Sequence, residues 1–179
     1  MATSTSVEIP AGTWVVDDAH STAAFEVEHG GLSTFRGTFS PIQAKLTSDG
    51  SSAVLEGSVR VGDISVDDDQ IRPHLLSPEF FDAERNPQIA FRSTAIEGTP
   101  DDLRVTGELS LAGATRTVEA TGRLRGPVDF GAAEKISVTL HAAIDRTDYG
   151  MDWQMQLPGG GEALGNEVRL NVELELVKS

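Results

Sequence analysis

The sequence contains no cysteine, and this absence excludes a whole group of chemistries. Disulfides, thiolate nucleophiles, iron–sulfur clusters and cysteine-based zinc sites all require a thiol. Secreted proteins can lack cysteine as well, so the absence assigns no compartment.

Basic residues are scarce. There are 14 Lys and Arg residues against 28 Asp and Glu residues, the net charge is −14, and no two basic residues are adjacent. Binding to a phosphate backbone relies on clustered Lys and Arg that displace counterions. We therefore expect neither nucleic acid nor an anionic membrane surface as a partner, and the acidic charge is typical of a solubilising surface.

Long apolar runs are also missing. No stretch approaches the roughly 20 apolar residues of a membrane-spanning helix, so we expect no stable membrane insertion. Residues 1–12 show neither the basic region nor the apolar region of a secretory signal. A cytoplasmic location is expected, with a periplasmic or secreted one if a leader has been removed. Residues 1–12 are predicted to be a flexible N-terminal tail, and 13–179 a single domain.

The dominant pattern is an alternation of apolar and polar residues, which is typical of half-buried strands. Phe25 and Val27, for example, alternate with Glu26 and Glu28. The pattern covers residues 21–29, 35–39, 42–46, 55–61, 89–93, 103–111, 118–124, 136–144 and 168–176. Strands with one wet and one dry face predict an all-β, antiparallel barrel or sandwich and argue against a parallel α/β sheet.

Two stretches break the alternation. Residues 67–81 are predicted to form a short helical segment, with Pro73 and Pro78 as starts or breaks. Residues 152–166 are predicted to form a long loop.

Many positions on the dry face are small. In a filled barrel, small residues fit the taper of the interior, whereas in a hollow one they leave space for a ligand. The sequence leaves both an apolar cavity and a solid core open. The small inward positions are Ala23, Gly37, Ala44, Gly57, Gly107, Ala120, Gly122 and Ala142.

Catalytic and metal-binding patterns are weak. The four histidines show no zinc-site spacing, and the serines show no nucleophile elbow. Arg146 could form a catalytic pair with Asp145 or Asp148, but neighbouring charges at a strand end more often form a salt bridge that fixes a bend. We assign no catalytic residue and no metal ligand.

Five ordered motifs resemble those of the YceI-like family of lipocalin-like, polyisoprenoid-binding proteins. They lie at residues 14–21, 29–39, 69–94, 109–116 and 145–151, and the resemblance spans Thr13 to Val177. It implies a lipocalin-like antiparallel β-barrel of about eight strands with a short helical segment, a long apolar interior and a possible homodimer. The chain has Ala112-Gly113-Ala114 where the family more typically has Lys-Gly-Val.

The resemblance also implies a function. We expect the barrel to bind a polyisoprenoid, an isoprenoid quinone or a fatty acid or amide, for transport, storage or protection, without a required cofactor. One alternative is an enzyme that acts on the bound lipid through His20 or residues 146–148. Another is a stress-related interaction protein with an incidental cavity.

The candidate ligand-binding residues are apolar inward positions and polar groups at a mouth bordered by residues 67–81 or 152–166. They are His20, Phe25, Val27, His29, Phe35, Phe39, Leu75, Phe80, Phe81, Phe91, Leu109, Leu140, Arg146, Tyr149 and Trp153.

Overall fold

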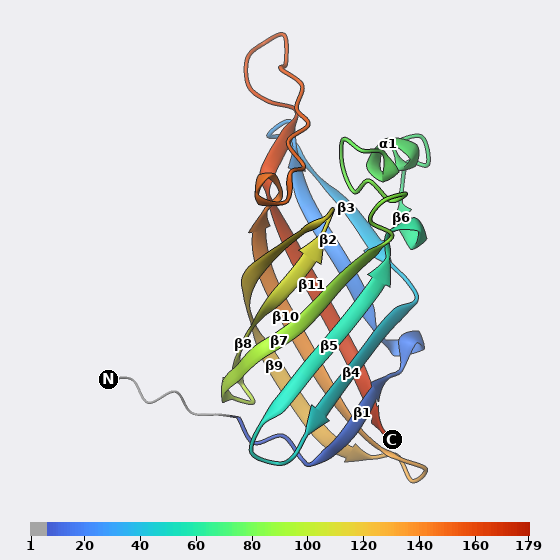
Figure 1. The fold of residues 1–179 in the computed structure, drawn as a ribbon, viewed down its shortest axis with the longest axis vertical. Helices are drawn as coiled ribbons and strands as arrows, with labels where there is room; N and C mark the ends of the chain where they lie inside the picture. The colour runs from blue at the N-terminus through green and yellow to red at the C-terminus, as the bar shows by residue number, and fades with distance from the viewer. Residues whose placement is uncertain (1–6) are drawn as a thin grey trace, which may run out of the picture.

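The computed structural model describes residues 7–179, and its strands wind around a long, slender barrel (Figure 1). The strands are β1 (Gly12–Val16), β2 (Thr22–His29), β3 (Ser33–Phe39), β4 (Ile42–Ser48), β5 (Ala53–Arg60), β6 (Ile64–Val66), β7 (Gln88–Thr99), β8 (Asp102–Leu111), β9 (Ala114–Asp129), β10 (Glu134–Asp145) and β11 (Leu164–Lys178). The helical elements are η1 (Asp18–His20), η2 (Val61–Asp63), α1 (Arg72–Leu76) and η3 (Arg146–Tyr149).

An antiparallel ring of eight strands closes the barrel, as the sequence predicts. Its order is β1-β4-β5-β7-β8-β9-β10-β11, and β1 closes the ring by pairing with both β4 and β11. Strand β2 continues along the same edge of β11, where Phe25 pairs with Leu170, and β3 and β6 follow. Both β1 and β2 pair with β11: β1 ends opposite Leu176, and β2 begins opposite Glu173. The turn η1 therefore forms the bend between these two consecutive strands.

All nine alternating segments form strands with the predicted dry faces. On β11, Leu174 and Leu176 are buried between exposed or half-exposed neighbours, and on β10 Val138 and Leu140 follow the same rule. Two strands, β1 and β6, were not predicted from the alternation. The five residues of β1 do not alternate, and β6 has only three residues, so neither is long enough to show a period of two.

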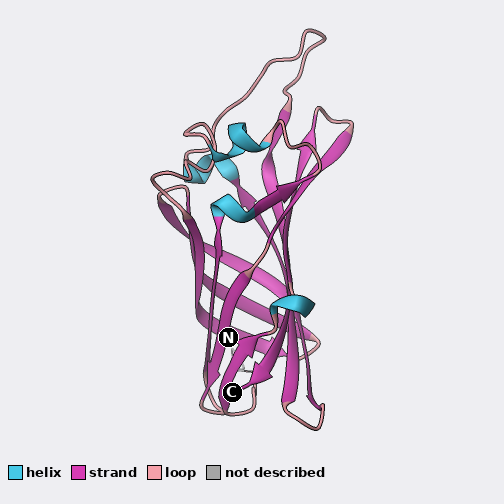
Figure 2. Cartoon of the chain, turned by 90° about the vertical axis from the view of Figure 1, so that its right-hand side faces the viewer, coloured by secondary structure: helices cyan, strands magenta, loops and turns pink. Residues whose placement is uncertain are grey.

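The predicted helical segment is real but short. Helix α1 covers Arg72–Leu76, with Pro73 in its first turn, where the missing N–H costs no hydrogen bond. The long loop ends earlier than predicted, because β11 already begins at Leu164 and one isolated bridge joins Gln156 to Glu162. Figure 1 and Figure 2 show α1 and the long loop at the same end of the barrel, opposite the end where the C-terminus lies.

A packed apolar core fills the other end of the barrel. Trp14 and Leu176 are fully buried, and Leu103 is nearly so. Val7 and Ile9 join this core, and the Ile9 carbonyl accepts a hydrogen bond of 2.7 Å from Ser48 Oγ. The described part of the expected flexible tail is therefore packed, because its apolar side chains cover this end of the barrel. Residues 1–6 lie outside the described part of the chain.

Candidate ligand-binding cavity

The barrel encloses a cavity of about 420 Å³. The cavity lies between the packed core, at the lower end of the barrel, and the end that carries α1 and the long loop, which we call the upper end. Its walls come from the inward faces of the strands, and α1 and the long loop add residues at the upper end (Figure 1). Among residues 7–179, the side chains in its lining that carry polar atoms are those of His29, Ser58, His74, Arg146 and Trp153. A volume of this size falls within the range of roughly 300–1,000 Å³ that is typical of small-molecule sites.

Three of the small inward glycines make room for neighbouring atoms, and the remaining small residues line open space. A methyl group built on Gly122 would overlap the carbonyl oxygen of Thr139 on β10. A methyl group built on Gly37 or Gly107 would overlap the ring of Phe25 or Phe91, so these two glycines make room for aromatic side chains. The others that line open space are Ala23, Ala44, Gly57, Ala120 and Ala142. The upper half of the interior is therefore hollow, and the solid-core alternative holds only for the lower end.

Phenylalanine rings form one wall of the cavity. The ring centroid of Phe25 lies 6.1 Å from Phe35, 5.9 Å from Phe39 and 6.4 Å from Phe81. Phe39 and Phe81 meet edge to face at 6.0 Å. These rings come from β2, β3 and the segment after α1, so their contacts hold the helical segment against the barrel.

A second aromatic group joins the two segments at the mouth. The ring of His74 meets Phe80 at 4.9 Å and Trp153 at 5.0 Å, both edge to face, and Phe80 lies 5.6 Å from Trp153. All three residues line the cavity, and we call them the aromatic clasp. Glu79 Oε2 lies 2.8 Å from His74 Nε2. The clasp connects α1 and the turn that follows it with the long loop, about 70 residues further along the chain. Both segments that were predicted to border the mouth, residues 67–81 and 152–166, therefore meet there.

Arg146 is the one charged side chain that is buried among residues 7–179, with 3% of its surface exposed. Its Nε donates to the Gly165 carbonyl at 2.9 Å, and its Nη1 donates to the Met151 carbonyl at 2.6 Å. These bonds hold the start of the long loop and the start of β11. Burial lowers the pKa of the Arg146 guanidinium, and the negative charges of Asp145, Asp152 and Glu162 oppose that shift.

The salt bridge expected beside Arg146 is not formed. Asp145 instead accepts hydrogen bonds from the backbone N–H and the hydroxyl of Thr147, at 2.9 and 2.6 Å, and caps η3. These bonds lower the pKa of the Asp145 carboxyl. The bend after β10 is therefore fixed by the Asp145 cap and by the hydrogen bonds from Arg146 to two carbonyls. The side chains of Asp145 and Arg146 have different partners and form no salt bridge with each other.

All of the predicted ligand-binding residues except His20 and Tyr149 line the cavity. Tyr149 is buried, but its hydroxyl has no hydrogen-bond partner within residues 7–179. Burial raises the pKa of this hydroxyl above its ordinary value. The expectation that Tyr149 places a hydroxyl at the mouth is wrong, since it packs behind the wall with Ile144 and Met151.

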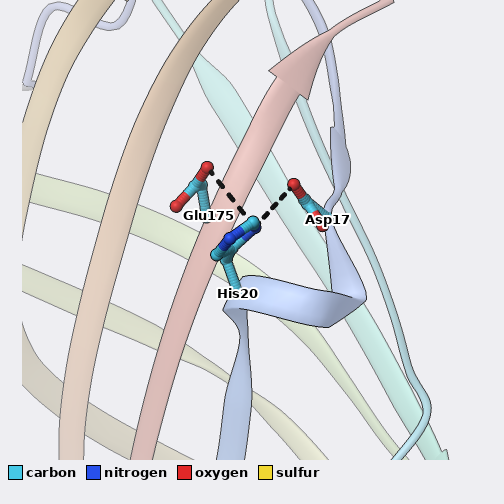
Figure 3. A group of neighbouring side chains, drawn as sticks. All are labelled: Asp17, His20 and Glu175. Atoms are coloured by element: carbon cyan, nitrogen blue, oxygen red, sulfur yellow. Dashed lines mark hydrogen bonds and ion pairs between the residues drawn. The ribbon is translucent and has the colours of Figure 1, made fainter.

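His20 lies on the outside of the barrel, in η1, and not at the cavity. Figure 3 shows its ring between Asp17 and Glu175, with Nδ1 3.0 Å from Asp17 Oδ2 and 4.0 Å from Glu175 Oε1. Lys135 Nζ is 2.7 Å from Glu175 Oε1 and 3.3 Å from Asp17 Oδ2. These four residues, Asp17, His20, Lys135 and Glu175, connect η1 with β10 and β11 at the bend between β1 and β2.

This exterior group also has the donor set of a metal site. One ligand atom each from Asp17, His20 and Glu175 lie within 4.8 Å of one another, which sequence spacing did not reveal. The ammonium of Lys135 already contacts both carboxylates, so a cation of the chain itself balances their charge. Hydrogen bonds from His20 and Lys135 lower the pKa of Asp17, and the bond to Glu175 chiefly raises the pKa of Lys135.

The sequence prediction omitted much of the lining. The inward face of β11 was visible in its alternation, and β11 supplies Val168, Leu170, Val172 and Leu174. His74 and Met151 carried no periodic signal, because they lie outside regular strands.

No helix within residues 7–179 is long and apolar enough to cross a membrane.

Comparisons with known proteins agree with this architecture. The sequence model of the YceI-like domain matches residues 14–176. A UPF0312 protein of Staphylococcus aureus (strain bovine RF122 / ET3-1) is 26% identical over 166 residues, covering 89% of this chain and 94% of that protein. The crystal structure of Burkholderia cenocepacia BcnA has a TM-score of 0.71 at 20% identity, covering 89% of this chain and 98% of that chain. A polyisoprenoid binding domain from Saccharophagus degradans, implicated in plant cell wall breakdown, has a TM-score of 0.68 at 11% identity, covering 95% and 100%. At these identities the two structures show a shared fold.

Proposed function

This chain belongs to the YceI-like domain family, and from that premise we propose that it binds a long-chain apolar ligand inside its barrel. The ligand is a polyisoprenoid, an isoprenoid quinone or a fatty acid or amide, which the protein carries, stores or protects. The observation that carries the proposal is the cavity of about 420 Å³ with its almost wholly apolar lining. The similar fold of a polyisoprenoid binding domain supports the same ligand class.

The energetics favour an apolar chain. Each 100 Å² of apolar ligand surface that leaves water contributes roughly 2.5 kcal/mol, while ordering a flexible chain opposes binding. An almost wholly apolar interior gains little from a compact polar metabolite, whose polar groups would lose their water. The mechanism we propose is passive encapsulation without a cofactor, with entry at the upper end past the aromatic clasp.

The direct test is mass spectrometry of an organic extract of the purified protein, followed by titration of the delipidated protein with an apolar fluorescent probe. We expect one long-chain species in near-stoichiometric amount and saturable binding of the probe. An empty extract together with an absence of probe binding would refute the proposal.

A matched pair of variants links binding to the cavity. Ala120 is buried and lines the cavity, whereas Ala143 is exposed on the outer face of β10. Ala120→Leu should weaken probe binding at least several-fold and stabilise the empty protein by up to ~1–2 kcal/mol, because added methylenes fill apolar space. Ala143→Leu should change neither quantity appreciably.

The enzyme alternative, which invoked His20 or residues 146–148, loses the first of these candidates. His20 lies outside the cavity, where it cannot reach a chain bound inside, and the guanidinium of Arg146 stays protonated at neutral pH. His20→Ala should therefore leave probe affinity unchanged. A fall in ligand conversion with retained binding would instead favour the enzyme. The third alternative expects a small or filled cavity, and the hollow interior does not favour it.

A further inference from the structure

The buried guanidinium of Arg146 lacks an anionic partner. No carboxylate oxygen within residues 7–179 lies within 4 Å of it. The two buried serines of that range, Ser48 and Ser93, each form a hydrogen bond with backbone. An unpaired buried charge is costly, since the interior screens it poorly and supplies no counterion.

The Arg146 guanidinium also has N–H groups that donate to no acceptor within residues 7–179. It carries five N–H groups, and the two hydrogen bonds of Arg146 come from Nε and Nη1. Nη2 therefore has no acceptor among the described residues, and Nη1 retains a second N–H. Two neighbouring nitrogens with free N–H groups match the two oxygens of a carboxylate, the geometry of a bidentate arginine–carboxylate pair.

Arg146 is placed where a ligand end would lie. It is one of the few polar side chains in the lining, and it belongs to η3, which follows β10 at the end of the barrel that carries α1 and the long loop (Figure 1). An apolar chain in the cavity would extend from Arg146 toward the packed core.

We propose that Arg146 binds the head group of the ligand and that this head group is a carboxylate, so that the cavity selects long-chain acids over neutral long-chain molecules. The inference rests on the proposed function and names the ligand class of the same cavity. A single guanidinium balances a single negative charge. A diphosphate head would bring more negative charge than a single guanidinium balances.

The first test varies the ligand and leaves the protein intact. Oleic acid, oleamide and oleyl alcohol share one chain length and differ at the head, and each is used at neutral pH to displace an apolar fluorescent probe from delipidated protein. We expect oleic acid to bind at least 10-fold more tightly than the other two. Equal displacement by all three would overturn the inference while leaving the proposed function standing. Failure of the probe and of all three ligands to bind would overturn the proposed function itself.

The second test varies the charge. Arg146→Gln should abolish the preference for the acid, and Arg146→Lys should retain part of it. Arg169→Gln removes one positive charge from the exposed face of β11 and should preserve the preference in full. A preference that persists in Arg146→Gln would overturn the inference, because the carboxylate would then be recognised elsewhere.

Arg146 also bonds to two loop carbonyls, so the glutamine variant could lose its fold. Carbon NMR of oleic acid labelled at its carboxyl carbon, bound to the wild-type protein, needs no variant. A carboxylate paired with Arg146 should stay ionised to a lower pH than the same acid dispersed in detergent. A bound carboxyl that titrates at or above the detergent value would contradict the pairing.

Discussion

The ring of Phe25 on β2 covers Gly37, its direct partner on β3. The pair belongs to the phenylalanine wall of the cavity, and it shows how a small residue in this barrel can serve packing instead of leaving space. Gly57 also lies on an inward face, but no side-chain or backbone atom comes closer than 3.5 Å to a methyl group built there.

This contrast predicts opposite outcomes for two alanine substitutions. Gly37→Ala should destabilise the protein by about 1–3 kcal/mol, because the new methyl group displaces the Phe25 ring. Gly57→Ala should be tolerated, since its methyl group enters the cavity at ordinary contact distance. Urea unfolding of both variants measures the difference, and equal loss of stability in the two would contradict the assigned packing.

Tyr149 provides a second prediction. Its buried hydroxyl has no hydrogen-bond partner in the described structure, and a polar group buried without a partner costs about 1–3 kcal/mol. Tyr149→Phe should therefore leave the free energy of unfolding unchanged or raise it by up to ~1 kcal/mol. A marked loss of stability would show that the hydroxyl does form a hydrogen bond, for example through a buried water.

The pKa of the Tyr149 hydroxyl can be measured directly. Tyr149 is the only tyrosine of the chain, and burial raises its pKa above the ordinary value of about 10. In an alkaline titration followed by phenolate absorbance, the folded protein should ionise at a higher pH than the urea-unfolded chain. Coinciding curves would mean that the side chain is open to water.

Asp49 predicts an acid-dependent contribution to stability. Hydrogen bonds from the backbone and side chains of Ser51 and Ser52 lower its pKa from 3.8 to about 2. A lowered folded-state pKa means that the contribution is present above pH ~4 and is lost as the pH falls through about 2. Asp49→Asn should lower the urea midpoint at pH 6, and the difference from wild type should shrink between pH 4 and 2. A pH-independent difference would show that charge is not its cause.

The aromatic clasp predicts a kinetic effect on ligand release. Trp153→Ala removes an edge-to-face contact with His74 and a tilted ring contact with Phe80, each worth about 0.5–1.5 kcal/mol. Dissociation of an apolar probe, followed by stopped-flow fluorescence, should become roughly 2- to 10-fold faster. Met155→Ala, at an exposed position of the same loop, is the control and should leave the rate unchanged. An unaltered rate in Trp153→Ala would place the exit elsewhere.

The sequence by itself determined the strands and their orientation. An antiparallel strand with one wet face must alternate, so the pattern around Phe25 and Val27 predicted both the strand and the side that faces inward. The same reasoning placed half of the aromatic candidates, those on β2, β3 and β7, at the cavity, and the ordered motifs indicated the family. Strand β6, with three residues, was too short to show a period.

Only the tertiary structure decided what the small residues do and how the charges are partnered. Gly37 and Gly57 look alike in the sequence, yet the pairing register places a phenyl ring over one and open space beside the other. Arg146 and Asp145 are neighbours in the chain, but the turn η3 turns the aspartate to Thr147 and leaves the arginine buried at the cavity. Alternation specifies which face a side chain occupies, whereas its contacts depend on strands and loops that lie far away in the sequence.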